Sequence, residues 1–231
     1  MKTIGLLGGM SWESSALYYR ILNEEVKDRL GGLHSARCVM LSVDFAEIER
    51  LQMAGEWERA GALLAEEARR IEAAGAEMLL LCTNTMHKLA PQIEAAISIP
   101  FLHIADAIGA AIRKAGLQTV GLLGTRFTME EAFYAARLRE HWDLEVLVPD
   151  PAGREIVHKI IYKELVLGIV REESRREYLR NIDGLRRRGA EGIIEGCTEI
   201  GMLIGPEHTD VPLFDTTRIH ALAAVEAALS E

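Results

Sequence analysis

The sequence predicts an α/β protein made of two similar halves, each a Rossmann-like domain with a mostly parallel sheet and helices on both faces. Three observations predict this fold class. Short apolar runs alternate with helical patterns along the chain, as expected for a mostly parallel sheet. Three segments of the first half recur in the same order in the second. The 231 residues, with 49% hydrophobic content, can bury one large core or two small ones.

The predicted strands are short apolar runs, several of which end in glycine. Gly8 and Gly9 follow the first run, and Gly124 follows the fourth. Between the runs lie helical patterns with apolar residues at i, i+3 and i+4 spacing. One helix is expected to end at Gly31–Gly32, and another to run from Trp57 to Ala73. The strands, in order, are Thr3–Leu7, Cys38–Val43, Met78–Cys82, Val120–Leu123, Val146–Val148 and Gly192–Ile194.

The repeated segments predict the domain organisation. TIGLLGGMSW near the start resembles TVGLLGTRFT at 119–128, MLLLCTNT at 78–85 resembles GIIEGCTE at 192–199, and SIPFLHIADA at 98–107 resembles DVPLFDTTRI at 210–219. Internal repeats of this kind indicate two related halves. We expect one domain of residues 1–102 plus 211–231 and a second of residues 103–210. Ligands of open α/β sheets bind beyond the carboxyl ends of strands, so the active site is expected in the cleft between the domains.

Composition excludes several classes of function. The net charge of −9 argues against nucleic acid as a partner. No run approaches the roughly 20 apolar residues of a membrane span, and the N-terminus resembles a strand rather than a signal peptide, so a soluble cytoplasmic protein is expected. The cysteines, Cys38, Cys82 and Cys197, are far apart and form no CxxC pair. Neither a disulfide framework nor a metal site is therefore expected.

Small polar residues follow two of the predicted strands. Thr83, Asn84 and Thr85 come after one, and Cys197, Thr198 and Glu199 come after its counterpart in the second half. Turns that open helices have free backbone N–H groups, which can hold a carboxylate. The same reasoning makes Met10 and Ser11, after Gly8–Gly9, candidate substrate contacts.

Cys197 is the strongest candidate for chemistry. A thiol at the N-terminus of a helix has a lowered pKa, and its thiolate is a good base and nucleophile. Cys38, inside a strand, is expected to be a small buried residue instead. Glu199 complicates this expectation, because a nearby carboxylate raises the pKa of a thiol. It could be protonated, paired, or turned toward a substrate ammonium group, and the sequence does not choose among these.

The motifs LCTNTMH at 81–87 and EGCTEIG at 195–201 resemble the paired signatures of the aspartate/glutamate racemase family. IGLLGGMSWESSALYY and IIYKELVLG also resemble segments of that family, so the similarity covers essentially the whole chain. The resemblance implies two pseudo-symmetric α/β domains and racemisation of an acidic amino acid without a cofactor. It also implies that one residue from each domain faces the α-carbon, one removing the proton and the other delivering a proton to the opposite side.

The chain departs from the family at one of these two positions. Where the family has a cysteine directly before Asn-Thr, this sequence has Thr83, and Cys82 lies one residue earlier. Side chains alternate along a strand, so Cys82 should point away from the site. We therefore expect Thr83 and Cys197 as the catalytic pair. A threonine hydroxyl is a poorer proton donor than a cysteine thiol. We therefore expect one enantiomer to exchange its α-proton faster than it racemises.

The remaining substrate contacts are expected from the resemblance. The family places a side-chain clamp in the loop after its second strand, where Gln52 or Arg50 would serve. Lys163 matches a family lysine that is expected to bind a substrate carboxylate. His87 could support the turn or act in catalysis. The family also suggests a homodimer, which is the commonest soluble assembly.

Two alternatives stay open on sequence grounds. One is a related enzyme that acts beside a carboxylate or amide, such as a hydantoin racemase or a decarboxylase. The other is a protein that binds an acidic amino acid and catalyses weakly, because Thr83 replaces a titrating group.

Overall fold

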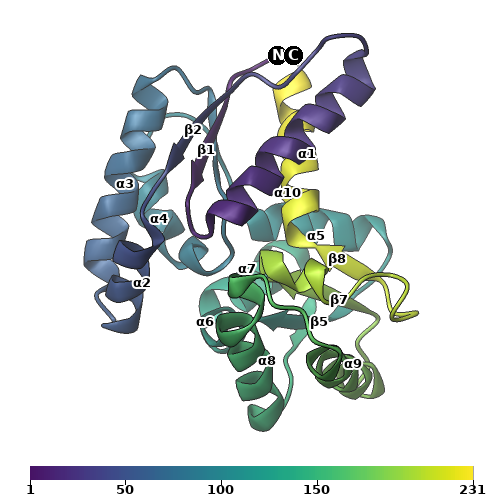
Figure 1. Ribbon diagram of the computed structural model, residues 1–231. Coiled ribbons are helices and arrows are strands. Elements are labelled where there is room, and N and C mark those ends of the chain that lie inside the picture. The colour runs from purple at the N-terminus through teal and green to yellow at the C-terminus, as the bar shows by residue number, and fades with distance from the viewer. Residues whose placement is uncertain (231) are drawn as a thin grey trace. The chain divides into compact units, whose positions relative to one another are not determined.

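The computed structural model describes residues 1–230 and divides them into two compact units (Figure 1). Unit 1 contains Met1–Ile104 together with the C-terminal residues from His220 onward, and unit 2 contains Ala105–Ile219. Each unit is built around one four-stranded parallel sheet, as the sequence predicts.

The sheet of unit 1 has the strand order β2-β1-β3-β4. Its strands are β1 (Ile4–Gly8), β2 (Cys38–Ser42), β3 (Met78–Leu81) and β4 (Phe101–Leu102). All pairings are parallel. Every residue of β1 and β3 is buried, because a parallel sheet is covered by helices on both faces.

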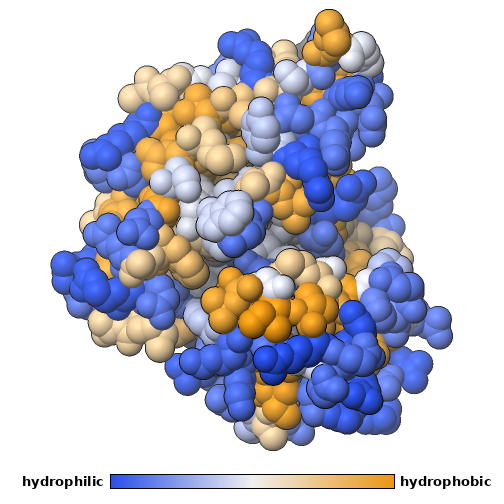
Figure 2. All heavy atoms as spheres, viewed as in Figure 1, coloured by the Kyte–Doolittle hydropathy of each residue, from blue (hydrophilic) through white to orange (hydrophobic). Residues whose placement is uncertain are grey.

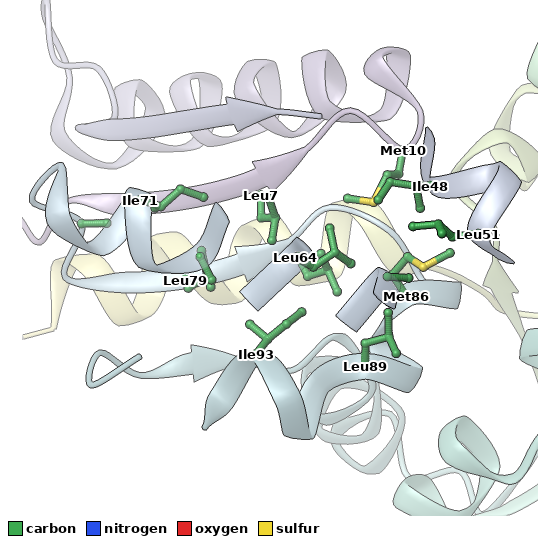
Figure 3. Packing of buried hydrophobic residues seen from close by; sticks show 14 residues of the cluster. Leu7, Met10, Ile48, Leu51, Leu64, Ile71, Leu79, Met86, Leu89 and Ile93 are labelled. Carbon is green, nitrogen blue, oxygen red and sulfur yellow. The ribbon is translucent and has the colours of Figure 1, made fainter. Parts of the chain in front are cut away.

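Two helices cover one face of this sheet, and the others cover the opposite face. The first pair is α1 (Trp12–Leu30) and α10 (Thr216–Leu229), which share a core with the even-numbered residues of β1. The second core, shown in Figure 3, joins Leu7 and Leu79 of the sheet to Leu64 and Ile93 of the helices. Its helices are α2 (Phe45–Met53), α3 (Trp57–Ala73), the short 3-10 helix η1 (Thr85–Leu89) and α4 (Ala90–Glu94).

The sheet of unit 2 has the order β6-β5-β7-β8, which repeats the order of unit 1 strand by strand. The strands are β5 (Thr119–Gly124), β6 (Glu145–Leu147), β7 (Gly192–Gly196) and β8 (Leu213–Asp215). The helical segments are α5 (Ile104–Lys114), α6 (Arg126–Glu130), α7 (Ala132–Trp142), α8 (Pro151–Lys163), η2 (Leu165–Leu167), α9 (Glu172–Arg187) and η3 (Thr198–Met202). The predicted pair of similar α/β halves is confirmed.

The chain changes units twice, and the second change comes later than the boundary at 211 expected from the sequence. β8 pairs with β7, so it belongs to the sheet of unit 2. Only the helix that follows, α10, contributes to unit 1, where Ala221, Ala224 and Val225 join its core. A strand is fixed by its backbone pairing, whereas the helix after it is free to pack elsewhere. In the same way, β4 pairs within unit 1 and the helix after it, α5, lies almost entirely in unit 2.

Candidate active site

The turn after β1 is held too tightly for any side chain at its glycines. A Cβ atom at Gly8 would lie 2.4 Å from Ser15 Oγ, and one at Gly9, where φ is 97°, would lie 2.3 Å from the carbonyl oxygen of Val43. Ser15 Oγ accepts a hydrogen bond from Gly9 N (2.8 Å) and donates one to the carbonyl of Ser11 (3.0 Å). The turn therefore brings the backbone to the carboxyl end of the sheet in one fixed shape.

Met10 and Ser11, both predicted substrate contacts, have their side chains engaged within unit 1. Met10 is buried in the core beside Ile48 (Figure 3). Ser11 caps α1, and its Oγ accepts from Ser14 N at 3.3 Å. Any contact of these two residues with a substrate, which stays a prediction, would use mainly the backbone of the turn.

Cys82 and Thr83 lie in different surroundings at the end of β3. Cys82 is fully buried in the core shared with Tyr18, and this burial raises the pKa of its thiol far above the ordinary value. Thr83 is 8% exposed. Its N–H donates to the carbonyl of Leu81 (2.9 Å), and its own carbonyl lies 2.7 Å from Nδ1 of His87. The Cys82 thiol is enclosed by apolar side chains and has no exposed surface, so a substrate cannot reach it in this structure.

The other predicted contacts in unit 1 are buried, apart from Arg50. Asn84 and Thr85 follow Thr83 and are 3% and 7% exposed. Of the two candidates on α2, Gln52 is 3% exposed, whereas Arg50 is exposed. Four of the expected residues, Thr83, Asn84, Thr85 and Gln52, are thus fixed by packing within one unit.

In unit 2, Cys197, Thr198 and Glu199 form a hydrogen-bonded cluster at the end of β7. Oε2 of the buried Glu199 accepts from the Cys197 thiol at 3.0 Å and from the Thr198 hydroxyl at 2.7 Å. Of the alternatives for Glu199, the structure favours a paired carboxylate. The cluster brings a proton donor, Cys197, into direct contact with a proton acceptor.

The prediction that the pKa of Cys197 is lowered is wrong, because burial and the adjacent Glu199 carboxylate hold it well above its usual value. The helix that follows, η3, is a 3-10 segment of five residues, too short for peptide dipoles to add up to a strong field. The carboxylate accepts directly from the thiol, so ionising the sulfur would place two negative charges side by side.

Tyr178 and Glu195 are site neighbours that the sequence analysis missed. Tyr178, on α9, is fully buried, and its pKa is raised by burial and by the charges of Cys197 and Glu199. Glu195 lies on β7, two residues before Cys197, and burial, with the nearby Asp215, raises its pKa to about 8. Its Oε1 has no hydrogen-bond partner within the described chain. The one signal in the sequence was a charged residue inside an apolar strand.

Lys163 is the last residue of α8 and is exposed. The segment that follows exposes Leu167, Ile169 and Val170, and Figure 2 shows the apolar surface over this connection between α8 and α9. Lys163 therefore lies beside an apolar segment, within the same unit as Cys197.

Three further findings bear on the expected chemistry. Cys38, Cys82 and Cys197 are free thiols. Within residues 1–230, no group of three or more His, Cys, Asp or Glu side chains is arranged to hold a metal ion. None of the helices in that range is long and apolar enough to cross a membrane.

The class of protein defined by the structure is a two-domain α/β protein with a repeated sheet and a thiol–carboxylate pair at the end of one strand. Residues 7–224 match the Asp/Glu/Hydantoin racemase family, and the chain belongs to that family. It is therefore an isomerase of the amino-acid racemase class.

Two solved structures and one named racemase are similar to this chain. A Yersinia pestis protein assigned as an Asp/Glu racemase is 53% identical, with a TM-score of 0.94 over 100% of both chains. An aspartate racemase homologue from Pyrococcus horikoshii OT3 is 32% identical, with a TM-score of 0.87 over 100% of both chains. The broad specificity amino-acid racemase RacX of Bacillus subtilis (strain 168) is 23% identical over 170 residues, which is 71% of this chain and 70% of the relative.

Proposed function

We propose that this racemase acts on acidic amino acids, aspartate or glutamate, without a cofactor, and that Thr83 and Cys197 serve the two sides of one α-carbon. The single observation that carries the proposal is the contact of 3.0 Å between the Cys197 thiol and the Glu199 carboxylate. Family membership makes proton transfer at an α-carbon the reaction to explain, and this pair is able to move a proton.

The Cys197 side works as a base in two steps. Glu199 first takes the thiol proton through the existing hydrogen bond, which leaves a thiolate beside a neutral carboxyl group. The thiolate then removes the α-proton, and the electron pair of the broken C–H bond spreads into the substrate carboxylate. Hydrogen-bond donors fixed around that carboxylate stabilise the developing charge. In the opposite direction, Cys197 returns its proton to the same face of the carbon.

The Thr83 side must supply a proton to the other face. The threonine hydroxyl does not ionise near neutral pH, so it gives its proton to the carbanion and takes one from a water molecule. The hydroxide that remains is neutralised by the proton that the Cys197–Glu199 pair releases to solvent. This step is slower than transfer at a thiol. Exchange of the α-proton that faces Cys197 should therefore be faster than racemisation.

The substrate contacts that we propose are those expected from the sequence. Asn84 and Thr85 follow one proton-transfer position, and Thr198 follows the other. The backbone of Met10 and Ser11 would hold a carboxylate. Gln52, buried on α2, is preferred to the exposed Arg50, and a lysine such as Lys163 pairs with a carboxylate as a point charge.

The experiment is incubation of the protein with each enantiomer of aspartate and glutamate in deuterium oxide. NMR follows loss of the α-proton, and chiral chromatography follows inversion. We expect Cys197→Ser to abolish exchange and Cys82→Ser to retain it. Loss of activity in a folded Cys82→Ser protein instead would reject Thr83 in favour of Cys82. If no enantiomer of either substrate exchanges, the acidic-amino-acid assignment fails.

Thr83 itself favours a second candidate, a protein that binds an acidic amino acid and turns it over very slowly. Calorimetric titration with the same four compounds, beside the exchange measurement, separates the two functions. Binding without exchange identifies the binder. Exchange of a hydantoin, or release of carbon dioxide from a malonate, would instead identify another chemistry of the superfamily.

We further propose a cytoplasmic homodimer. The reason for a dimer is that twofold assemblies are the commonest among soluble proteins. Sedimentation velocity across a concentration series would test the assembly, and cell fractionation would test the location.

A further inference from the structure

The side chain of His87 joins two backbone segments of unit 1. It lies in η1 and is 1% exposed. Nδ1 lies 2.7 Å from the carbonyl oxygen of Thr83, and Nε2 lies 3.1 Å from the N atom of Ile104, the first residue of α5. Met86 and Leu89 hold the same short helix in the core (Figure 3). The histidine ring therefore has a fixed position from which to act on both segments.

The two contacts select one form of the imidazole ring. A backbone N–H can only donate, so Nε2 accepts the proton of Ile104 N and carries none itself. A carbonyl can only accept, so Nδ1 carries the proton and donates it to Thr83. The neutral ring with hydrogen on Nδ1 satisfies both contacts at once. Ile104 is the first residue of α5, so its N–H has no acceptor within the helix. Nε2 of His87 supplies that acceptor.

These contacts fix the peptide groups on both sides of Thr83. Its N–H is bound to the carbonyl of Leu81 at 2.9 Å, and its carbonyl is bound by His87. With both peptides held, the direction of the Cα–Cβ bond is set. Only rotation about that bond is left to place the hydroxyl.

We propose that His87 is a positioning residue that holds the Thr83 hydroxyl in the geometry needed for proton transfer on that side of the substrate. The proposal rests on the function proposed above and deepens it. Misplacement of a reacting group by about 1 Å can slow a step about 100-fold. His87 acts through Thr83, so its loss should slow the proton transfer on the Thr83 side selectively.

Asparagine and glutamine separate the two contacts of His87. The amide nitrogen of asparagine occupies the place of Nδ1, so His87→Asn can keep the bond to the Thr83 carbonyl. The terminal amide of glutamine reaches the place of Nε2, so His87→Gln can keep an acceptor for Ile104 N and lose the donor to Thr83. Both variants keep a polar, neutral side chain, and His87→Phe removes both contacts.

The measured quantity is the rate of racemisation divided by the rate of α-deuterium exchange, for the enantiomer that exchanges faster. Partial unfolding lowers both rates equally and leaves this ratio unchanged. We expect His87→Gln and His87→Phe to lower the ratio at least about tenfold, and His87→Asn to stay within about threefold of wild type. His34→Gln, at an exposed histidine, is the control for substitution alone.

Three results would overturn the proposal. One is an unchanged ratio in His87→Gln, and another is an equal fall in His87→Asn. The third comes from NMR of the 15N-labelled imidazole groups, if His87 carries its proton on Nε2. Failure of the underlying function looks different, because wild-type protein would then neither exchange nor racemise any of the four substrates, and the role of His87 would fall with it.

Discussion

Replacing Glu199 by glutamine should lower the pKa of the Cys197 thiol. Ionised sulfur beside the carboxylate places two negative charges 3.0 Å apart. Glutamine keeps the shape of the side chain and removes the charge. Its amide N–H can also donate to the thiolate, which favours the ionised form further.

The size of the change follows from the distance. Two unit charges at this separation repel by about 1.4 kcal/mol in a medium like bulk water and by about 5.5 kcal/mol at an effective dielectric constant of about 20. At about 1.4 kcal/mol for each pKa unit, the expected fall lies between about one and four units. Cys197 is only partly buried, so water screens part of the repulsion.

Alkylation by iodoacetamide measures this pKa, because only the thiolate reacts. The rate at the Cys197 peptide, followed by mass spectrometry across a pH series, gives its titration curve without interference from Cys38 or Cys82. Thr198→Val is the matched control, since it removes the other donor to the same oxygen and keeps the charge. If the curves of wild type and Glu199→Gln coincide, the carboxylate does not control the thiol and the proposed two-step base is wrong.

Three further predictions concern the buried groups. Cys82→Ser should lower the free energy of unfolding by about 1–3 kcal/mol, measured by urea denaturation, because it buries a hydroxyl among apolar side chains. Burial lowers the pKa of His220 from 6.5 to about 4. The contribution of the neutral ring to the free energy of unfolding is therefore fully present above pH 6.5 and is lost as the pH falls. Between pH 7.5 and 5 the loss is about 2 kcal/mol, and His220→Gln should flatten this part of the stability curve. Glu195 should give the opposite pH dependence, because folding raises its pKa from 4.5 to about 8. The free energy of unfolding should fall as the pH rises between these values, and the loss at pH 7 is about 3 kcal/mol. Unfolding curves of Glu195→Gln should lack this fall, and an unchanged slope would mean that Glu195 does not titrate in the folded protein.

The sequence predicted those parts of the fold that depend on local periodicity and on the internal repeat. Strands at β1, β3, β5 and β7 were visible as apolar runs, and the repeated segments related the two sheets. The return of the chain to unit 1 was placed too early. Residues 213–215 pair with β7. The sheet to which a short edge strand adds depends on tertiary contacts, and the hydrophobic periodicity of the sequence does not predict these.

The sequence predicted those properties of the site that depend on the position of a single residue at the end of a strand. It predicted less well those that depend on contacts between side chains. The surroundings of Cys82 follow from alternation along β3. The pKa of Cys197 does not follow from its place before a helix, because it depends on the conformation of Glu199 and on the short length of η3. His87 was visible in the sequence as a candidate either for supporting its turn or for catalysis. Its contact with Ile104 joins residues 17 positions apart, and no motif encodes it.

The exchange of helices between the units has a consequence for how the chain is made. The core of unit 1 includes α10, so this unit is incomplete on the ribosome until α10 emerges. All of unit 2 is synthesised earlier, which makes it the first unit able to fold. Lys2 N donates to the carbonyl of Ala228 at 2.9 Å, so the two ends of the described range, residues 1–230, are neighbours (Figure 1). A circular permutant that starts at Ala105, with the old ends joined by a short linker, would encode each unit as one uninterrupted stretch.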